Sequence, residues 1–315
     1  MNAVLITGGN GFIGSHLVDA LAAAGRRVVS YDLYPRPFEP PPDNAVFIQG
    51  NLDDSELVRR TIVDEGVEVV VHAAWASIHE TSLKDPAADV EANLVPTLRL
   101  LDACREAGVR RLVFLSSGGQ VYGVPERNPI REDHPANPIS AYGAAKLAAE
   151  KYVGMYERLY GLESVILRPS VPYGPRQNPR RRQGAAAVFI HRALHRLPVE
   201  IWGDGEVQRD YFYIEDLSRA LAAAVDSPAA AGGVFNLGGR ETISLNGLAA
   251  AIERALELKI EIQYKEARRF DVPALALDWS AAQRVLGWSP EVELEDGIRR
   301  TAAWLKKWFD ERDGK

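Results

Sequence analysis

A glycine-rich turn close to the N-terminus constrains the fold of this chain more than any other feature. Residues 3–7 are apolar and mostly β-branched, which predicts a buried strand, and residues 15–25 predict a helix with one apolar face and a terminal glycine. The turn between them, residues 8–14, has the glycine spacing of a dinucleotide-binding turn. In this order, strand, turn and helix N-terminus direct backbone N–H groups and the helix dipole at a pyrophosphate. We therefore expect a dinucleotide cofactor to be bound by Gly8, Gly11, Phe12, Ile13 and Gly14.

An acidic residue at the end of the second predicted strand indicates which dinucleotide is bound. Asp32 follows the glycines by about 20 residues, the spacing at which a carboxylate accepts a hydrogen bond from a ribose 2′-hydroxyl. The same carboxylate would repel a 2′-phosphate, so we predict NAD rather than NADP. The alternative is an Asp that merely ends a strand, and the nearby Arg36 counts against NAD.

Composition excludes several classes of protein. The chain has 315 residues, of which 46% are hydrophobic and 25% charged, so it is globular rather than disordered. A net charge of −6 argues against a nucleic-acid partner, and no apolar stretch of about 20 residues is present to span a membrane. The single cysteine, Cys104, excludes a disulfide framework and a cysteine-based metal cluster. Because Met1 runs almost directly into the first strand, no signal peptide is expected, and we predict a soluble cytoplasmic protein.

Strands and helices alternate over the first half of the chain. Further strands are predicted at residues 46–48, 67–73, 111–116 and 162–168, and long helices at 87–108 and 140–160. Alternation of this kind predicts a doubly wound parallel sheet covered on both faces, the Rossmann α/β fold, with ligands bound beyond the carboxyl ends of the strands.

Several residues are expected along that edge of the sheet. Asn51 and Leu52 follow the third strand, where the adenine would lie, and Ala73 and Ala74 are small enough to let the cofactor approach the backbone. Asn93 is a polar residue of the first long helix that we expect to face the cofactor. His72 is interpreted as a hydrogen-bonded residue at a strand end rather than as a base.

Beyond residue 168 the pattern becomes irregular and rich in proline, and the predicted elements are shorter. We assign residues 1–168 to a dinucleotide-binding domain and residues 169–315 mainly to a smaller substrate-binding lobe, with segments near 210–240 rejoining the first domain. A basic loop formed by Arg176 and Arg180–Arg182 is either a solvated charge run or a lid that faces phosphate.

Tyr142 and Lys146 are the candidate catalytic pair. They lie four residues apart near the start of a predicted helix, so their side chains share one face. A phenol has an ordinary pKa of about 10 and is a poor base at neutral pH. A neighbouring ammonium and the positive charge of an oxidised nicotinamide both favour the phenolate. Tyr142 can then take a proton from a substrate hydroxyl, and Lys146 is also placed to hold the nicotinamide ribose.

Motifs along nearly the whole chain resemble those of the extended short-chain dehydrogenase/reductase family, in its nucleotide-sugar epimerase/dehydratase branch. They are Thr7 to Gly14, His72-Ala73-Ala74, Ser116-Ser117 with Val121-Tyr122-Gly123, Tyr142 with Lys146, Arg168 with Tyr173-Gly174-Pro175, Trp202 to Gly205 with Arg209-Asp210-Tyr211, and Asn236-Leu237-Gly238. The likeness is greatest to UDP-glucose 4-epimerases and their uronic-acid relatives. It implies bound NAD, a UDP-sugar substrate, and a homodimer joined through a four-helix bundle of the two long helices.

The resemblance also implies roles for individual residues. Ser116 and Ser117 would lie at the cofactor, and Arg209 and Arg268 would bind the diphosphate of the sugar nucleotide, because a guanidinium fork suits phosphate. The alternative for each arginine is a surface salt bridge.

Two departures from the family pattern affect the expected substrate site. The family places a Ser or Thr three residues before Val121, to hydrogen-bond the reacting hydroxyl, and this chain has Gly118 there. If Ser117 continues a strand, its side chain points to the other face, so a water or Ser116 would have to replace the missing hydroxyl. The second departure is Val171, where the family has an Asn beside the diphosphate, so one substrate hydrogen bond is lost.

Gln120 bears on the kind of reaction. The dehydratases of the family carry an acidic pair where Gly119 and Gln120 stand, so elimination of water has no evident acid or base here. We therefore predict an NAD-dependent epimerase that inverts C4 of a UDP-hexose or UDP-hexuronic acid, with Gly118, Gln120 and Val171 lining the substrate site. The alternatives are an NDP-4-keto-sugar reductase and a non-catalytic NAD(H)-binding regulator.

Overall fold

The computed structural model describes residues 3–77, 79–181, 184–267 and 272–313. Its main layer is a parallel sheet of seven strands in the order β11-β6-β5-β4-β1-β2-β3. The strands are β1 (Ala3–Thr7), β2 (Val28–Asp32), β3 (Ala45–Gln49), β4 (Val67–His72), β5 (Arg111–Leu115), β6 (Glu163–Pro169) and β11 (Gly233–Leu237). The strand order reverses between β1 and β4, which is where doubly wound sheets bind their ligands. The predicted Rossmann fold is confirmed.

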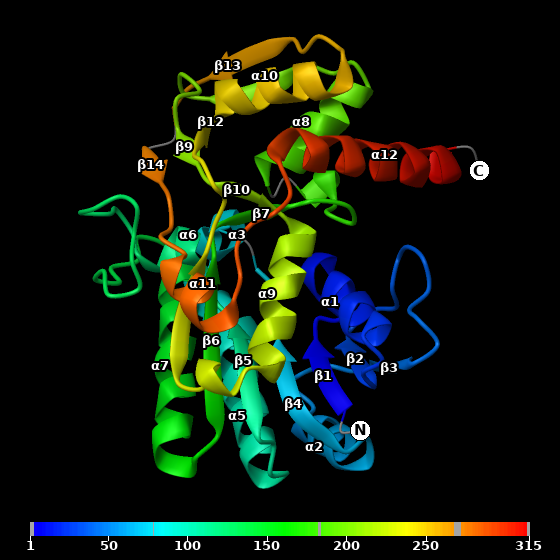
Figure 1. The fold of residues 1–315 in the computed structure, drawn as a ribbon, viewed down its shortest axis with the longest axis vertical. Helices are drawn as coiled ribbons and strands as arrows, with labels where there is room; N and C mark the ends of the chain where they lie inside the picture. Colours follow the sequence, from blue (N-terminus) through cyan, green and yellow to red (C-terminus); the bar gives the residue numbers. More distant parts are fainter. Residues whose placement is uncertain (1–2, 78, 182–183, 268–271, 314–315) are drawn as a thin grey trace.

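Helices cover both faces of this sheet (Figure 1). On one face α1 (Phe12–Ala23) and α9 (Ile214–Asp226) share a core with Val4 and Ile6 of β1. On the other face α2 (Ser55–Asp64), α5 (Val95–Glu106) and α7 (Ala141–Tyr160) share a second core with Leu5. Successive side chains of β1 enter opposite cores because side chains alternate along a strand, and a parallel sheet buried on both faces needs apolar residues at every position.

The predicted helix at residues 87–108 is interrupted in the structure. It consists of α4 (Pro86–Asp89), a π-helical turn η1 (Val90–Leu94) and then α5. Asp85 caps α4 by accepting a hydrogen bond from the Ala88 N–H at 3.0 Å. A π-turn inside a longer helix frequently marks a functional site, and this one contains Asn93.

A smaller lobe lies beyond the carboxyl ends of the sheet, in the upper part of Figure 1. It contains β8 (Val199–Trp202) paired with β13 (Ile262–Lys265), and the helices α8 (Ala185–Leu194), α10 (Leu245–Leu256) and α12 (Leu294–Asp313). Short strands connect the two parts: β7 (Val171–Tyr173) with β10 (Tyr211–Tyr213), and β9 (Gln208–Arg209) with β12 (Ile243–Ser244) and β14 (Ala274–Leu275). The remaining elements are α3 (His79–Lys84), α6 (Gly118–Val121), η2 (Pro179–Arg181), η3 (Pro228–Ala230) and α11 (Ser280–Leu286). Among the helices described, none has the length and apolar character needed to cross a membrane.

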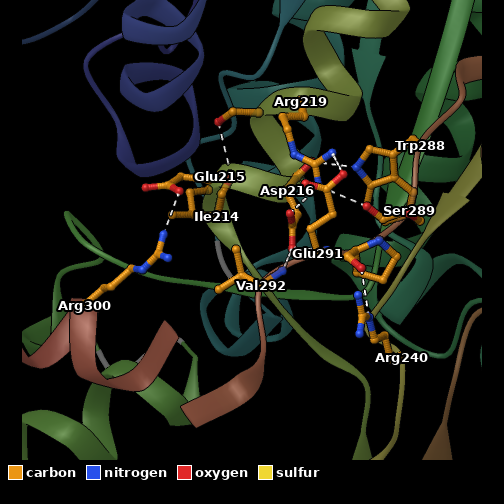
Figure 2. Close-up of polar contacts among 12 residues, drawn as sticks. Ile214, Glu215, Asp216, Arg219, Arg240, Trp288, Ser289, Glu291, Val292 and Arg300 are labelled. Carbon is orange, nitrogen blue, oxygen red and sulfur yellow. Dashed lines mark hydrogen bonds and ion pairs between the residues drawn. The ribbon is translucent and has the colours of Figure 1, made fainter. Parts of the chain in front are cut away.

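A buried carboxylate ties the C-terminal segment to the sheet layer (Figure 2). Asp216, in the first turn of α9, is fully buried and accepts from Arg219 Nη2 at 2.5 Å and from the N–H groups of Glu291 and Val292 at 3.1 Å each. The Asp216 carbonyl accepts from Trp288 Nε1 at 2.7 Å. Because Glu291 and Val292 lead directly into α12, these bonds fix where the last helix starts.

Candidate active site

The glycine turn joins β1 to α1, as predicted. Gly8 has a φ of +68°, and a Cβ placed on it would lie 2.9 Å from the Ala74 backbone. A Cβ on Gly14 would lie 2.1 Å from the Gly8 carbonyl oxygen, so only glycine fits at either position. The helix α1 begins after Gly11 without a side-chain cap, which leaves its first N–H groups for an anion.

Asp32 lies beside this turn. Its Oδ2 accepts from the Asn10 N–H at 3.0 Å and its Oδ1 from the Tyr34 N–H at 3.2 Å, so the carboxylate is fixed at the edge where a ribose would bind. Arg36 instead donates two hydrogen bonds to the Asp19 carboxylate of α1, from Nη1 to Oδ1 at 2.8 Å and from Nη2 to Oδ2 at 2.7 Å. Its guanidinium also lies over the Phe38 ring. Its guanidinium is thus engaged away from Asp32. The uncapped helix end, the tight turn and the carboxylate together fit NAD.

The residues expected along the cofactor edge surround the ends of β3 and β4. The N–H groups of Ala73 and Ala74 donate to the carbonyl and the hydroxyl of Thr7 at 3.2 and 3.3 Å, which holds this loop against the glycine turn. The Asn51 carbonyl accepts from the Tyr31 hydroxyl at 2.9 Å, and Leu52 packs against the second core. Their contact with the cofactor stays a prediction.

Asn93 is buried and holds the loop that follows β4. Its Oδ1 accepts from the Ala76 N–H at 2.6 Å, and its Nδ2 donates to Ser77 Oγ at 3.1 Å and to Asp89 Oδ1 at 3.0 Å. The side chain therefore shapes the cofactor edge through the loop, and a direct contact with the cofactor remains untested.

His72 lies between two threonine hydroxyls, with Nδ1 2.7 Å from Thr7 Oγ1 and Nε2 2.9 Å from Thr97 Oγ1. Burial, with a smaller contribution from the Lys146 charge, lowers the pKa of His72 to about 3, so the ring is neutral. This confirms its interpretation as a hydrogen-bonded residue at a strand end.

The structure places Tyr142 and Lys146 on one face of α7. Ser140 caps this helix by accepting from the Gly143 N–H at 3.1 Å, and the Tyr142 N–H donates to Ser82 Oγ of α3 at 3.1 Å. Lys146 is buried, and its Nζ donates to the Leu115 carbonyl at 2.6 Å, at the carboxyl end of β5. The Nζ lies 5.9 Å from the centroid of the Tyr142 ring.

The expectation that Lys146 and a bound nicotinamide together favour the phenolate of Tyr142 stays a prediction, because burial dominates the pKa of Tyr142 in the structure. Burial raises the pKa of Tyr142 above its ordinary value, the Asp89 carboxylate raises it further, and a hydrogen bond with Ser117 opposes them. Burial also lowers the pKa of Lys146 to about 7, against the opposing charges of Glu150 and Asp89. Enclosure therefore dominates both groups and disfavours the charged form of each.

The expectation that Ser117 continues a strand, with its side chain turned away from the substrate, is wrong. The strand β5 ends at Leu115, and Ser117 is the N-cap of the short helix α6, so strand alternation does not apply to it. Its hydroxyl lies close enough to Tyr142 to oppose the rise in the pKa of the phenol. The hydroxyl of Ser116 instead donates to Glu150 Oε1 at 2.5 Å. Ser117 therefore lies at the candidate base, and Ser116 serves the buried network below it.

That network joins α7 to the strands β6 and β11 of the main sheet. Glu150 is one turn beyond Lys146 on α7 and forms a buried ion pair with Arg168, at 2.5 Å between Oε2 and Nη2. Arg168 Nη1 donates to the Tyr122 hydroxyl at 2.8 Å, which donates to Asn236 Oδ1 of β11 at 2.7 Å. A buried ion pair whose polar atoms are bonded in this way holds a geometry more than it adds stability.

Trp75 is a residue that sequence reasoning missed. The centroid of its ring lies 3.8 Å from Lys146 Nζ and 6.0 Å from the centroid of the Tyr142 ring, so the ammonium faces an aromatic surface. Its Nε1 is buried, with no hydrogen-bond partner in the part of the chain that the structure describes. Its place directly after His72-Ala73-Ala74, at the carboxyl edge of β4, is the signal that could have found it.

The substrate-site predictions lie where the two lobes meet. A Cβ on Gly118 would lie 2.4 Å from Leu277 Cδ1 and 2.8 Å from the Arg168 carbonyl oxygen, so the usual Ser or Thr does not fit there. Gln120 Oε1 accepts from Ser140 Oγ at 3.0 Å and supports the start of α7. Val171 is a partly buried core residue of β7.

The basic side chains of the second half are only partly described. Arg209, in β9, donates to the Val272 carbonyl at 2.8 Å, and Arg268 and Arg182 lie outside the described residues. Arg176 donates to Asp19 at 2.6 Å, so this member of the basic loop is paired with α1. The diphosphate and lid interpretations stay predictions.

A dinucleotide turn at the switch point of a doubly wound sheet, with a Ser, a Tyr and a Lys gathered at the same edge, defines the class of short-chain dehydrogenases/reductases. Within that class, the chain belongs to the NAD dependent epimerase/dehydratase family, whose profile matches residues 4–238.

Full-length relatives agree with this assignment. The chain is 38% identical over 311 residues to a UDP-glucose 4-epimerase of Mycolicibacterium smegmatis, covering 96% of this chain and 98% of that one. It is similar to the crystal structure of a Thermotoga maritima UDP-glucose 4-epimerase with UDP-glucose, with a TM-score of 0.93, 36% identity and coverage of 98% and 99% of the two chains. A Thermus thermophilus UDP-glucose 4-epimerase in complex with NAD matches with a TM-score of 0.90 and 37% identity, over 96% and 99%.

Proposed function

We propose that this chain is an NAD-dependent epimerase that inverts C4 of a UDP-hexose or UDP-hexuronic acid through a transient 4-keto sugar. The observation that carries the proposal is the meeting of Ser117, Tyr142 and Lys146 at the edge that also holds the glycine turn and Asp32. The full-length likeness to UDP-glucose 4-epimerases supports the same conclusion.

The side chains divide the work of the reaction. When bound, NAD supplies a reversible hydride acceptor and a positive charge near the phenol. Tyr142 takes the proton of the C4 hydroxyl and later returns it, while Ser117 hydrogen-bonds the phenol and keeps it oriented. Lys146, whose pKa burial lowers to about 7, holds the cofactor ribose and balances the phenolate. Gln120 offers no carboxyl group, so the residues present support C4 inversion and disfavour loss of water.

The proposal is tested by C4 inversion across a panel of UDP-glucose, UDP-N-acetylglucosamine and UDP-glucuronic acid, measured with wild type and Tyr142→Phe. Loss of the phenolic proton carrier is expected to lower kcat by about 10²–10⁴-fold, with NAD still bound because the glycine turn is unchanged. If wild type inverts none of these sugars, the epimerase proposal is wrong.

A 4-keto-sugar reductase is the second candidate, since the same Tyr142 and Lys146 would serve it. Epimerisation regenerates the cofactor in every cycle, so NAD retained through purification and turnover without added NADH support the epimerase. Consumption of external NADH or NADPH with a 4-keto sugar would favour the reductase. Cofactor binding with no turnover of either kind would favour a non-catalytic NAD(H)-binding regulator.

We further propose a cytoplasmic homodimer joined through α5 and α7. On α7 the exposed side includes Ala144 and the large apolar residues Tyr152, Met155 and Leu159, which are 38–61% exposed. An apolar stripe of this kind suits a second copy of the same helix pair. Cofactor binding is assigned mainly to residues 1–168 and substrate binding mainly to residues 169–315. Light scattering of the purified protein tests the dimer.

A further inference from the structure

Asp89 is a buried carboxylate that the proposed mechanism does not yet use. It is the last residue of α4 and is only 4% exposed. Its Oδ1 accepts from Asn93 Nδ2 at 3.0 Å, whereas its Oδ2 is buried without a hydrogen-bond partner among the described residues. Burying a carboxylate oxygen without a donor costs free energy, so such a group calls for a specific explanation.

A chain of hydrogen bonds fixes the position of Asp89. Thr7, at the start of the glycine turn, bonds His72, and His72 bonds Thr97. The Thr97 hydroxyl donates to the Asn93 carbonyl at 2.7 Å, and Asn93 holds both the carbonyl and Oδ1 of Asp89. The carboxylate is therefore positioned from the cofactor turn through β4 and the π-turn, and it is not free to turn toward solvent.

The element that faces Asp89 is α7, which packs against both α4 and η1. The titratable groups of α7 that sense the Asp89 charge are Tyr142 and Lys146, and that charge raises the pKa of both. Lys146 also faces Glu150 of its own helix and the neutral His72 of β4, and its Nζ lies over the rings of Trp75 and Phe114. Glu150 raises the pKa of Lys146 more than Asp89 does, but its carboxylate is shared with Arg168, whereas Asp89 has no arginine partner among the described residues.

We propose that Asp89 is a positioning residue of the active site, whose carboxylate, together with that of Glu150, supplies the counter-charge that keeps Lys146 in its ammonium form. The inference rests on the proposed function, because it assigns Asp89 a role in the same reaction. Without the Asp89 charge, the enclosure of Lys146 shifts its equilibrium further toward the neutral amine.

The direction of the pH effect follows from these charges. With NAD bound, whose positive charge favours the phenolate, Tyr142 sets the acid limb of the pH profile and the Lys146 ammonium sets the alkaline limb. Asp89→Asn removes a negative charge that raises both pKa values, so both limbs of log kcat/KM are expected to move to lower pH, by about one pH unit. At pH 8 the variant then loses activity, while near pH 6 it keeps or gains activity.

The matched control is Glu91→Gln, which removes the same charge from an exposed position two residues away. Its pH profile is expected to coincide with that of wild type. Asp89→Glu restores the charge and should return both limbs to their wild-type positions. Limbs that stay in place in Asp89→Asn while only the melting temperature falls would show a purely structural role and overturn the proposal.

A second measurement separates this inference from the proposed function. Titration of 13Cε-labelled lysine by NMR, with the Lys146 signal identified by its absence in Lys146→Met, follows the amine without any turnover. Its midpoint is expected at lower pH in Asp89→Asn than in wild type, even if no UDP-sugar proves to be a substrate. An unchanged midpoint would overturn the role of Asp89 and leave the epimerase proposal intact. Should Asp89→Asn fail to fold, Asp89→Ser carries the same expectation.

Discussion

Asp216 and Asp89 are both buried aspartates, and they differ in how their oxygens are bonded. Asp216 receives three donors, from Arg219, Glu291 and Val292, so both of its oxygens are satisfied (Figure 2). Asp89 receives one side-chain donor, from Asn93, and leaves Oδ2 without a partner in the described structure. A fully hydrogen-bonded carboxylate such as Asp216 has a structural role, because it fixes the segment that bonds it. A carboxylate with an unbonded oxygen, such as Asp89, costs free energy, and we interpret its role as electrostatic.

The largest effect expected from this comparison is on stability. Asp216→Ala leaves the Arg219 guanidinium and two N–H groups without their acceptor where α12 begins, so the free energy of unfolding should fall by about 3 kcal/mol. The drop is measured by denaturant unfolding or as a lower melting temperature. The fraction that remains folded should keep wild-type kcat, because the Asp216 carboxylate bonds Arg219, Glu291 and Val292 rather than Tyr142 or Lys146. A changed pH profile in Asp216→Ala would break the distinction between the two aspartates.

A smaller effect, on rate rather than stability, is expected at the two adjacent serines. Ser117→Ala removes the hydroxyl that bonds Tyr142 and should lower kcat by about 10²-fold. Ser116→Ala removes a donor to Glu150, which keeps its two bonds from Arg168, so kcat should change little. Single-turnover rates measured under saturating UDP-sugar compare the two. The reverse order would show that Ser116 and not Ser117 serves the reacting hydroxyl.

The cofactor half of the molecule was predictable because its signals are local. The spacing of the glycines, the alternation of strand and helix, and Asp32 at the end of β2 each lie within a short stretch of chain. The same is true of Tyr142 and Lys146, which one helical turn brings together.

The rest depended on where elements end and on contacts between distant residues. The interpretation of Ser117 failed because β5 stops at Leu115, and an end point is the least certain part of a predicted strand. Gly118 is explained by Leu277, more than 150 residues away, and the enclosure that raises the pKa of Tyr142 comes from several elements. The pairing of β11 with β6 was likewise invisible in the local pattern.

Asp210 gives the smallest expected effect. Like Asp89, it is a buried aspartate with one carboxylate oxygen bonded and the other without a partner in the described chain. Its Oδ2 accepts from the Leu277 N–H at 2.9 Å, its Oδ1 has no partner in the described chain, and burial raises its pKa to about 7.

A carboxyl whose pKa is raised by folding contributes stability that is present below its unfolded pKa of about 4 and is lost as the pH rises through 7. Asp210→Asn cannot ionise, so wild type should lose about 2–3 kcal/mol of unfolding free energy relative to this variant between pH 5 and pH 8. Parallel denaturant titrations at the two pH values measure the difference. Because no described contact joins Asp210 to Tyr142 or Lys146, its missing partner should appear in the pH dependence of stability, whereas that of Asp89 should appear in the pH dependence of the rate. An identical pH dependence of stability in wild type and Asp210→Asn would mean that an unpaired oxygen in this fold carries no measurable cost, and the contrast between Asp216 and Asp89 would lose its physical basis.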